Sequence, residues 1–146
     1  MSVMAQKDIG NKTPLHELKT TDEVMKYYDE WSKDNKYNKD MSEWQYSGPK
    51  ETSEILSKYQ SNKDIKIYDA GCGSGLVGLE LKKYGFNHFD GGDISKELLN
   101  QIPANLYNEL EQIDLNKNIL KKDDFYDVVM CVGTVSYTHL TLPTNA

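Results

Sequence analysis

The sequence has 146 residues, enough for one domain with a hydrophobic core, and carries a formal net charge of −6 with a pI near 5.0. Lys and Arg form no dense block, so a nucleic-acid partner is not indicated, and no apolar run reaches transmembrane length. Cys72 and Cys131 lie far apart outside any C-x-x-C pair, which argues against a zinc or disulfide framework. We expect a cytoplasmic protein with no metal site and no membrane contact.

The N-terminal part divides into a polar leader and a helical cover. Residues 1–19 are polar and without periodicity, and we expect a flexible leader there. Thr20 and Glu23 form a capping box, which predicts a helix beginning near Thr20. Pro49 suits the first turn of a second helix. We therefore expect an N-terminal helical cover over residues 20–60, with two helices separated by a polar stretch.

Aromatic residues recur along this cover. Val24, Tyr28 and Trp31 share one face of the first predicted helix, and Tyr37 follows in a polar stretch over residues 32–46. We expect Trp31 to be core, whereas Tyr28 and Tyr37 are candidates either for core or for contact with a ligand.

From residue 64 onward, short apolar runs alternate with helical patterns, which is typical of βαβ units. The fold class predicted is α/β, a Rossmann-like three-layer sandwich with a parallel sheet, truncated after the fourth strand. The last apolar run is continuous, which predicts a central strand buried on both faces. The predicted strands are residues 65–69, 88–93, 107–113 and 125–133, with helices over residues 76–84 and from Ser95 to Pro103.

Three glycines at alternate positions, Gly71, Gly73 and Gly75, connect the first predicted strand to its helix. Such a turn presents backbone N–H groups to a nucleotide-like ligand. A dinucleotide fingerprint needs glycine where Leu76 stands, and the charge of Asp69 opposes a pyrophosphate but suits a cation. S-adenosyl-L-methionine, an adenosine joined to a sulfonium and an ammonium group, satisfies both conditions.

Acidic residues terminate three consecutive predicted strands. Because parallel strand ends line one crevice, we expect Asp69, Asp93 and Asp114 to meet there. Asp69 would hold the methionine portion, Asp93 would accept from ribose hydroxyls and Asp114 from an adenine amino group. Ile94 and Leu115, which follow two of these acids, are candidates to sandwich the adenine or to be ordinary core.

These residues resemble the class I S-adenosylmethionine-dependent methyltransferases. The resemblance is carried by DAGCGSG at residues 69–75, GDIS at 92–95 and DVVMCVG at 127–133. Within that superfamily, the chain is similar to the methyltransferase-like proteins named after the Williams–Beuren syndrome chromosome region. That narrower similarity rests on five short segments: Tyr28-Asp29-x-Trp31, Tyr46-x-Gly48-Pro49, Gly73-x-Gly75-Leu76-Val77, Gly85-Phe86 and Val132-Gly133-Thr134-Val135.

The resemblance implies a Rossmann-like sheet that binds S-adenosylmethionine across its first three strands. It supplies no methyl acceptor, which we leave as an unknown small molecule or protein, and no catalytic residue. The predicted cofactor-binding residues are Asp69, Ala70, Gly71, Cys72, Gly73, Gly75, Asp93, Ile94, Asp114 and Leu115.

The C-terminal stretch departs from this pattern. Residues 136–144, SYTHLTLPT, resemble the translation of a sequencing adapter; the alternative is an unusual genuine loop followed by an early stop. We therefore expect a partial methyltransferase domain over residues 61–135, an artefactual tail over residues 136–146, and weak or absent activity from this chain itself.

Two other functions are compatible with the pattern. An NAD-dependent oxidoreductase uses a similar sheet, although Leu76 weighs against it. A nucleotide-binding module without turnover would need the same turn and the same acids.

Overall fold

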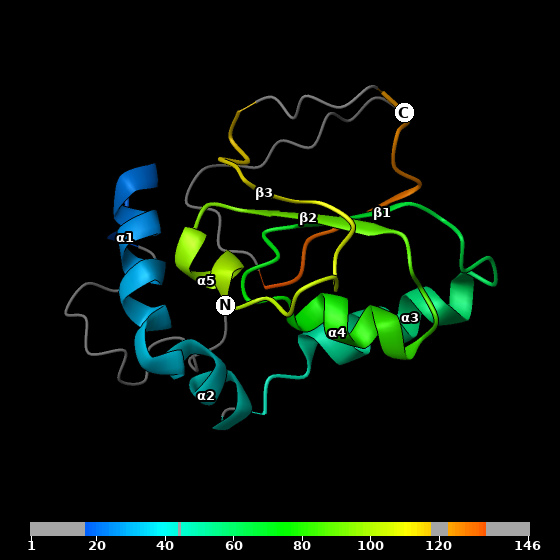
Figure 1. The fold of residues 1–146 in the computed structure, drawn as a ribbon, viewed down its shortest axis with the longest axis horizontal. Coiled ribbons are helices and arrows are strands. Elements are labelled where there is room, and N and C mark those ends of the chain that lie inside the picture. Colours follow the sequence, from blue (N-terminus) through cyan, green and yellow to red (C-terminus); the bar gives the residue numbers. More distant parts are fainter. Residues whose placement is uncertain (1–16, 44, 118–122, 134–146) are drawn as a thin grey trace.

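The computed structural model describes residues 17–43, 45–117 and 123–133. Their centre is a parallel four-stranded sheet in the order β3-β2-β1-β4, with β1 at Ile67–Ala70, β2 at Phe89–Asp93, β3 at Leu110–Gln112 and β4 at Val128–Met130 (Figure 1). The α/β Rossmann-like prediction is confirmed. The strands are shorter than expected, and Tyr107 lies before β3 instead of inside it.

The N-terminal cover consists of α1 (Thr21–Ser32), the 3₁₀ helix η3 (Lys33–Asn35) and α2 (Lys36–Glu43). The predicted capping box is present, since the Thr20 side chain accepts from the Glu23 N–H and the Glu23 carboxylate accepts from the Thr20 N–H. Asp34 has a φ of 55°, a left-handed conformation that separates α1 from α2. The cover is therefore bent into two helices.

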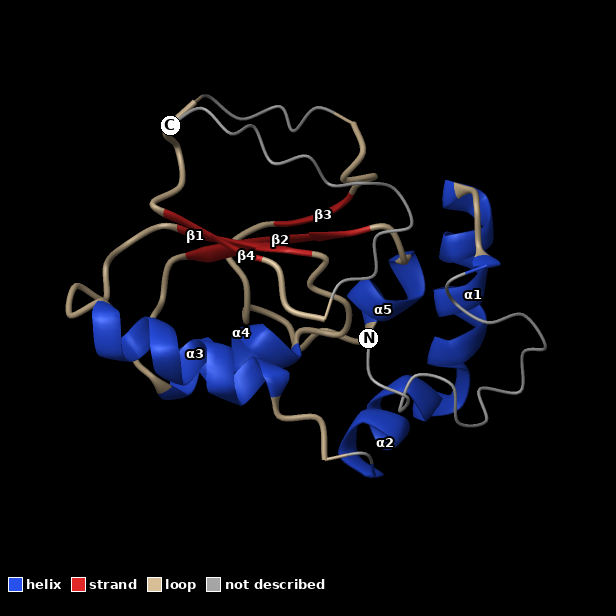
Figure 2. Cartoon of the chain, turned by 180° about the vertical axis from the view of Figure 1, so that it is seen from behind, coloured by secondary structure: helices blue, strands red, loops and turns tan. Residues whose placement is uncertain are grey.

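Helices α3 (Gly48–Tyr59) and α4 (Leu76–Lys83) pack against each other on one side of the sheet (Figure 2). Pro49 stands in the first turn of α3, as predicted. The short helix α5 (Lys96–Asn100) follows β2, and its N-cap Ser95 accepts from the Leu98 N–H. No helix in the described part of the chain is long and apolar enough to cross a bilayer.

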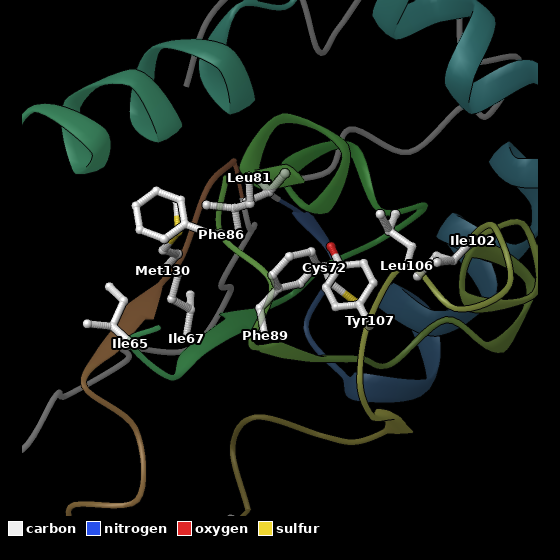
Figure 3. Close-up of a cluster of buried hydrophobic side chains, with 11 residues drawn as sticks. Ile65, Ile67, Cys72, Leu81, Phe86, Phe89, Ile102, Leu106, Tyr107 and Met130 are labelled. Carbon is white, nitrogen blue, oxygen red and sulfur yellow. The ribbon is translucent and has the colours of Figure 1, made fainter. Parts of the chain in front are cut away.

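The main core lies between the sheet and α4 (Figure 3). Ile67 and Met130 point into it from neighbouring strands, and Leu81 and Phe86 meet them from α4 and the turn that follows it. Burial of such side chains stabilises the fold by about 1.5–3 kcal/mol each.

Burial of the fourth strand on both faces was predicted wrongly. Val128 and Met130 face the core, but Val129 points the other way and is 60% exposed. Cys131 is exposed as well. The reason is topological: β4 stands at an edge of the sheet that the described residues form, and α3 and α4 cover the opposite face.

The predicted leader and the predicted C-terminal tail fall largely outside the described residues. Residues 1–16 of the leader and the whole adapter-like stretch at residues 136–144 are not among the described residues. Leu18 is described, is buried, and packs with Val24 and Trp31 of α1.

Candidate functional site

The glycine turn joins β1 to α4. The N–H groups of Gly71 and Cys72 both donate to the carbonyl oxygen of Gly92, at 2.8 and 3.0 Å, and so attach the turn to β2. Gly75 has a φ of +89°, and a Cβ there would lie 3.2 Å from Ile102, so both conformation and space favour glycine. The turn is thus held against the carboxyl ends of β1 and β2.

Asp93, the last residue of β2, braces this turn. Its Oδ2 accepts from the Gly73 N–H at 2.8 Å, and its Oδ1 accepts from the Ser95 N–H at 2.8 Å. Burial raises the pKa of Asp93, although these N–H groups act in the opposite direction and lower it. The carboxylate thereby connects the glycine turn to the loop that enters α5.

Asp69 is the most deeply buried of the three acids, at 1% exposed. Its Oδ2 accepts from the Tyr107 hydroxyl at 2.6 Å, whereas its Oδ1 is buried and accepts from no described residue. Burial raises the pKa of Asp69 to about 7; the Tyr107 hydrogen bond lowers it and the charge of Asp93 raises it. A buried oxygen without a partner requires an explanation, and a bound cation supplies one.

Asp114 lies two residues beyond β3, in a different environment. Its Oδ2 accepts from the Thr21 hydroxyl at 3.2 Å, and its Oδ1 accepts from the backbone N–H and the side-chain amide of Asn116, both at 2.9 Å. Partial burial alone would raise the pKa of Asp114, but these hydrogen bonds hold it below its ordinary value. The structure therefore brings Asp69 and Asp93 together, while Asp114 contacts the beginning of α1.

The remaining predicted residues flank these acids. Ala70 and Cys72 are buried beside the turn, and Cys72 belongs to the main core. Ile94 packs against the aromatic cluster of α1, and Leu115 is half-buried.

Sequence patterns missed the polar contacts that fasten the N-terminal cover to the site. Ser95 Oγ donates to Asp29 Oδ1 at 2.6 Å, and Ser74 Oγ donates to Asn38 Oδ1 at 2.6 Å. Periodicity marks the apolar face of a helix and carries no signal for such polar pairs. The cover is therefore fixed to both turns that border the candidate site.

The predicted roles of the three cover aromatics are partly resolved. Trp31 is core, 4% exposed, with its Nε1 donating to Asp40 Oδ2 at 2.7 Å. Burial raises the pKa of Tyr28 and of Tyr37, and the charge of Asp93 raises both further. Both phenols therefore lie within the electrostatic reach of the site. A Cβ on Gly73 would lie 3.8 Å from the Tyr37 hydroxyl.

Chemically, the site offers buried carboxylates and a glycine turn, a combination that suits a ligand with a positive charge and hydroxyl groups. The described ranges contain no group of three His, Cys, Asp or Glu side chains placed to hold a metal ion.

Comparisons with known proteins extend this description. Residues 67–144, just over half of the chain, match a family described as "Methyltransferase domain". The chain is 30% identical over 144 residues to Methyltransferase-like protein 27 of Homo sapiens, covering 91% of this chain and 58% of that protein. It is 35% identical over 71 residues to the ribosomal protein L11 methyltransferase of Lactobacillus johnsonii, covering 47% of this chain and 22% of that protein. It thus spans less than two thirds of the length of these relatives.

A solved structure supports the fold. The magnesium protoporphyrin IX methyltransferase of Synechocystis PCC 6803 with bound SAH superposes with a TM-score of 0.54 at 19% identity, covering 76% of this chain and 57% of that one. The family match begins at Ile67, the first residue of β1, and continues through the glycine turn, β2 and Asp93. By this match, the chain belongs to the methyltransferase domain family.

Proposed function

We propose that the protein is an S-adenosyl-L-methionine-dependent methyltransferase and that the glycine turn with Asp69 and Asp93 holds the cofactor. The observation that carries the proposal is the buried Oδ1 of Asp69, which accepts no hydrogen bond from any described residue. A carboxylate in that position suits a ligand with a positively charged group far better than a pyrophosphate.

The residues present fit the cofactor. Asp69 would receive its ammonium group, and Asp93, at the end of β2, would accept from its ribose hydroxyls. Ile94 and Leu115 would contact the adenine, and Asp114 would accept from its amino group. When bound, S-adenosylmethionine supplies an electrophilic methyl group on a sulfonium. The contribution of this chain is to bind and orient that group and to exclude water, for which Tyr28 and Tyr37 are suitably placed.

The acceptor is a small molecule or a protein in this proposal. No side chain is assigned to acid–base catalysis, since attack on a sulfonium methyl requires mainly alignment of the two reacting atoms. The cytoplasm is the proposed location, consistent with the free thiols of Cys72 and Cys131.

Isothermal titration of the chain with S-adenosylhomocysteine and, separately, with NADH tests the assignment. We expect saturable binding of S-adenosylhomocysteine and none of NADH. Asp93→Ala should weaken binding of S-adenosylhomocysteine by about tenfold or more, because a hydrogen bond to a charged group contributes about 1.5–3 kcal/mol.

Asp90→Ala is the matched control, since Asp90 lies on the same strand and also accepts from a backbone N–H, that of Glu109 at 3.0 Å. It stands near the beginning of β2, away from the glycine turn, and its loss should leave binding unchanged. Binding of NADH in place of S-adenosylhomocysteine, or equal losses from the two substitutions, would contradict the proposal.

A further inference from the structure

Tyr107 holds a fixed position beside the candidate site. Tyr107 is 7% exposed, and its ring meets Phe89 edge to face at 4.9 Å between centroids (Figure 3). A Cβ on Gly78 would lie 2.6 Å from this ring, and a Cβ on Gly91 2.9 Å from it. Helix α4 and strand β2 thus each carry a glycine where the ring passes, which leaves the ring little freedom to move.

The hydroxyl of Tyr107 forms two hydrogen bonds, one as acceptor and one as donor. It accepts from the backbone N–H of Gly78 at 3.1 Å and donates to Asp69 Oδ2 at 2.6 Å. Gly78 lies in the first turn of α4, where a backbone N–H has no acceptor within the helix. Because the hydroxyl has one proton and receives the Gly78 N–H, it donates that proton to Asp69.

We infer that Tyr107 is a positioning residue for the cofactor: it anchors Oδ2 of Asp69 to the first turn of α4 and leaves Oδ1 to receive a cationic group. This inference rests on the proposed function and extends it to a residue from outside the glycine turn. Tyr107 acts only through Asp69.

Electrostatics at Asp69 agree with this role. The titratable groups facing it are Tyr107, Asp93 of β2, the Cys72 thiol of the turn and the Tyr37 hydroxyl of α2. None of these is cationic, and no described residue forms an ion pair with Asp69. Burial raises the pKa of Asp69 to about 7, and the Tyr107 hydroxyl opposes that rise, so its removal favours the protonated acid. A protonated carboxyl no longer attracts an ammonium group.

The test is Tyr107→Phe, which keeps the ring and removes the hydroxyl. Isothermal titration between pH 6 and pH 8 would compare S-adenosylhomocysteine with 5′-methylthioadenosine, which lacks the amino-acid portion and therefore the ammonium group. At pH 7 we expect affinity for S-adenosylhomocysteine to fall about tenfold, with its pH midpoint moved upward, and affinity for 5′-methylthioadenosine to stay unchanged. In an Asp69→Asn background, Tyr107→Phe should cause no further loss.

Tyr126→Phe is the matched control. The Tyr126 hydroxyl donates to Asp90 Oδ2 at 2.8 Å, a second Tyr–Asp pair, beside a hollow of about 220 Å³ near the beginning of β2. Its removal should change the affinity for neither ligand.

Each outcome decides between the two proposals. A wild-type chain that binds neither ligand contradicts the proposed function itself. Wild-type binding with equal losses for both ligands, or no loss, in Tyr107→Phe overturns the inference alone. If Tyr107→Phe does not fold, the wild-type pH profile decides. The affinity of the wild type for S-adenosylhomocysteine must then rise from pH 6 to pH 8, while its affinity for 5′-methylthioadenosine stays constant. The same pH dependence for both ligands would contradict the inference.

Discussion

Two buried acids of this chain differ in how completely their oxygens are satisfied. Both oxygens of Asp93 accept backbone N–H groups of the surrounding loops, whereas one oxygen of Asp69 has no partner among the described residues. A buried polar atom left in this state costs about 1–3 kcal/mol. Asp69 therefore destabilises the ligand-free fold, and a binding role explains why such a residue stands there.

The cost at Asp69 should appear in the pH dependence of stability. Because its pKa is raised to about 7 from 3.8, the folded state holds a proton that the unfolded state releases, so stability falls as pH rises between those values. Asp69→Asn should abolish this decline and be more stable than the wild type at pH 8 by roughly 1–4 kcal/mol, while losing affinity for S-adenosylhomocysteine.

Urea unfolding at pH 5 and pH 8 checks this expectation. An equal loss of stability in the wild type and in Asp69→Asn over that interval would show that Asp69 ionises without penalty.

Gly75 permits a second comparison at the scale of single residues. Gly75 and Gly85 have nearly equal φ values, +89° and +88°, but a Cβ on Gly75 lies 3.2 Å from Ile102, whereas one on Gly85 lies 3.9 Å from Lys63. Gly85→Ala should cost about 1 kcal/mol from backbone strain alone. Gly75→Ala should cost clearly more and weaken cofactor binding, as measured by thermal unfolding and titration. Equal losses of stability in the two variants would mean that the Ile102 side chain moves aside without an energetic cost.

Among the elements, α2 is joined by polar contacts both to α1 and to the glycine turn. Its one buried residue, Asp40, accepts from Trp31 of α1 and from Lys36 of α2 itself. Asn38 of α2 accepts from Ser74 in the glycine turn. This turn contact links the helix directly to the candidate site.

Ser74→Ala should therefore loosen α2 without unfolding the sheet. Loss of one partly buried hydrogen bond of about 1 kcal/mol predicts roughly fivefold faster amide hydrogen exchange across Lys36–Glu43. Ser61→Ala, at an exposed position in the loop after α3, is the control and should leave exchange in α2 unchanged. Faster exchange throughout the sheet in Ser74→Ala would count against a local effect.

Elements with strong local signals were predictable from the sequence. The capping box at Thr20, Pro49 at the beginning of α3 and the glycine turn before α4 each depend on neighbouring residues, and the structure contains all three features. Long-range pairs were not predictable, because Tyr107 approaches Asp69 only after β3 is placed beside β2. The exposure of Val129 likewise follows from the position of β4 at the edge of the described sheet. The local sequence around Val129 does not predict that position.

For the whole molecule, both edge strands of the described sheet carry an exposed apolar side chain. Val129 is 60% exposed and Leu110 40% exposed, on the two edge strands of the described sheet. Exposed edges with apolar side chains promote association between chains.

Val129→Thr should reduce concentration-dependent association, measured by light scattering, because it retains a β-branched side chain and adds a hydroxyl. Leu79→Thr, at a 40% exposed position on α4, is the control and should have little effect. Equal scattering from the wild type and Val129→Thr would show that the exposed Val129 side chain does not cause the association.

The strand order β3-β2-β1-β4 also has a consequence for synthesis. Ile67 pairs on one side with Phe89 and on the other with Val128. A chain that emerges from the ribosome N-terminus first can complete the first pairing long before the second. Until residue 128 emerges, one flank of β1 has no partner strand, so a stalled or shortened nascent chain would expose it to chaperones.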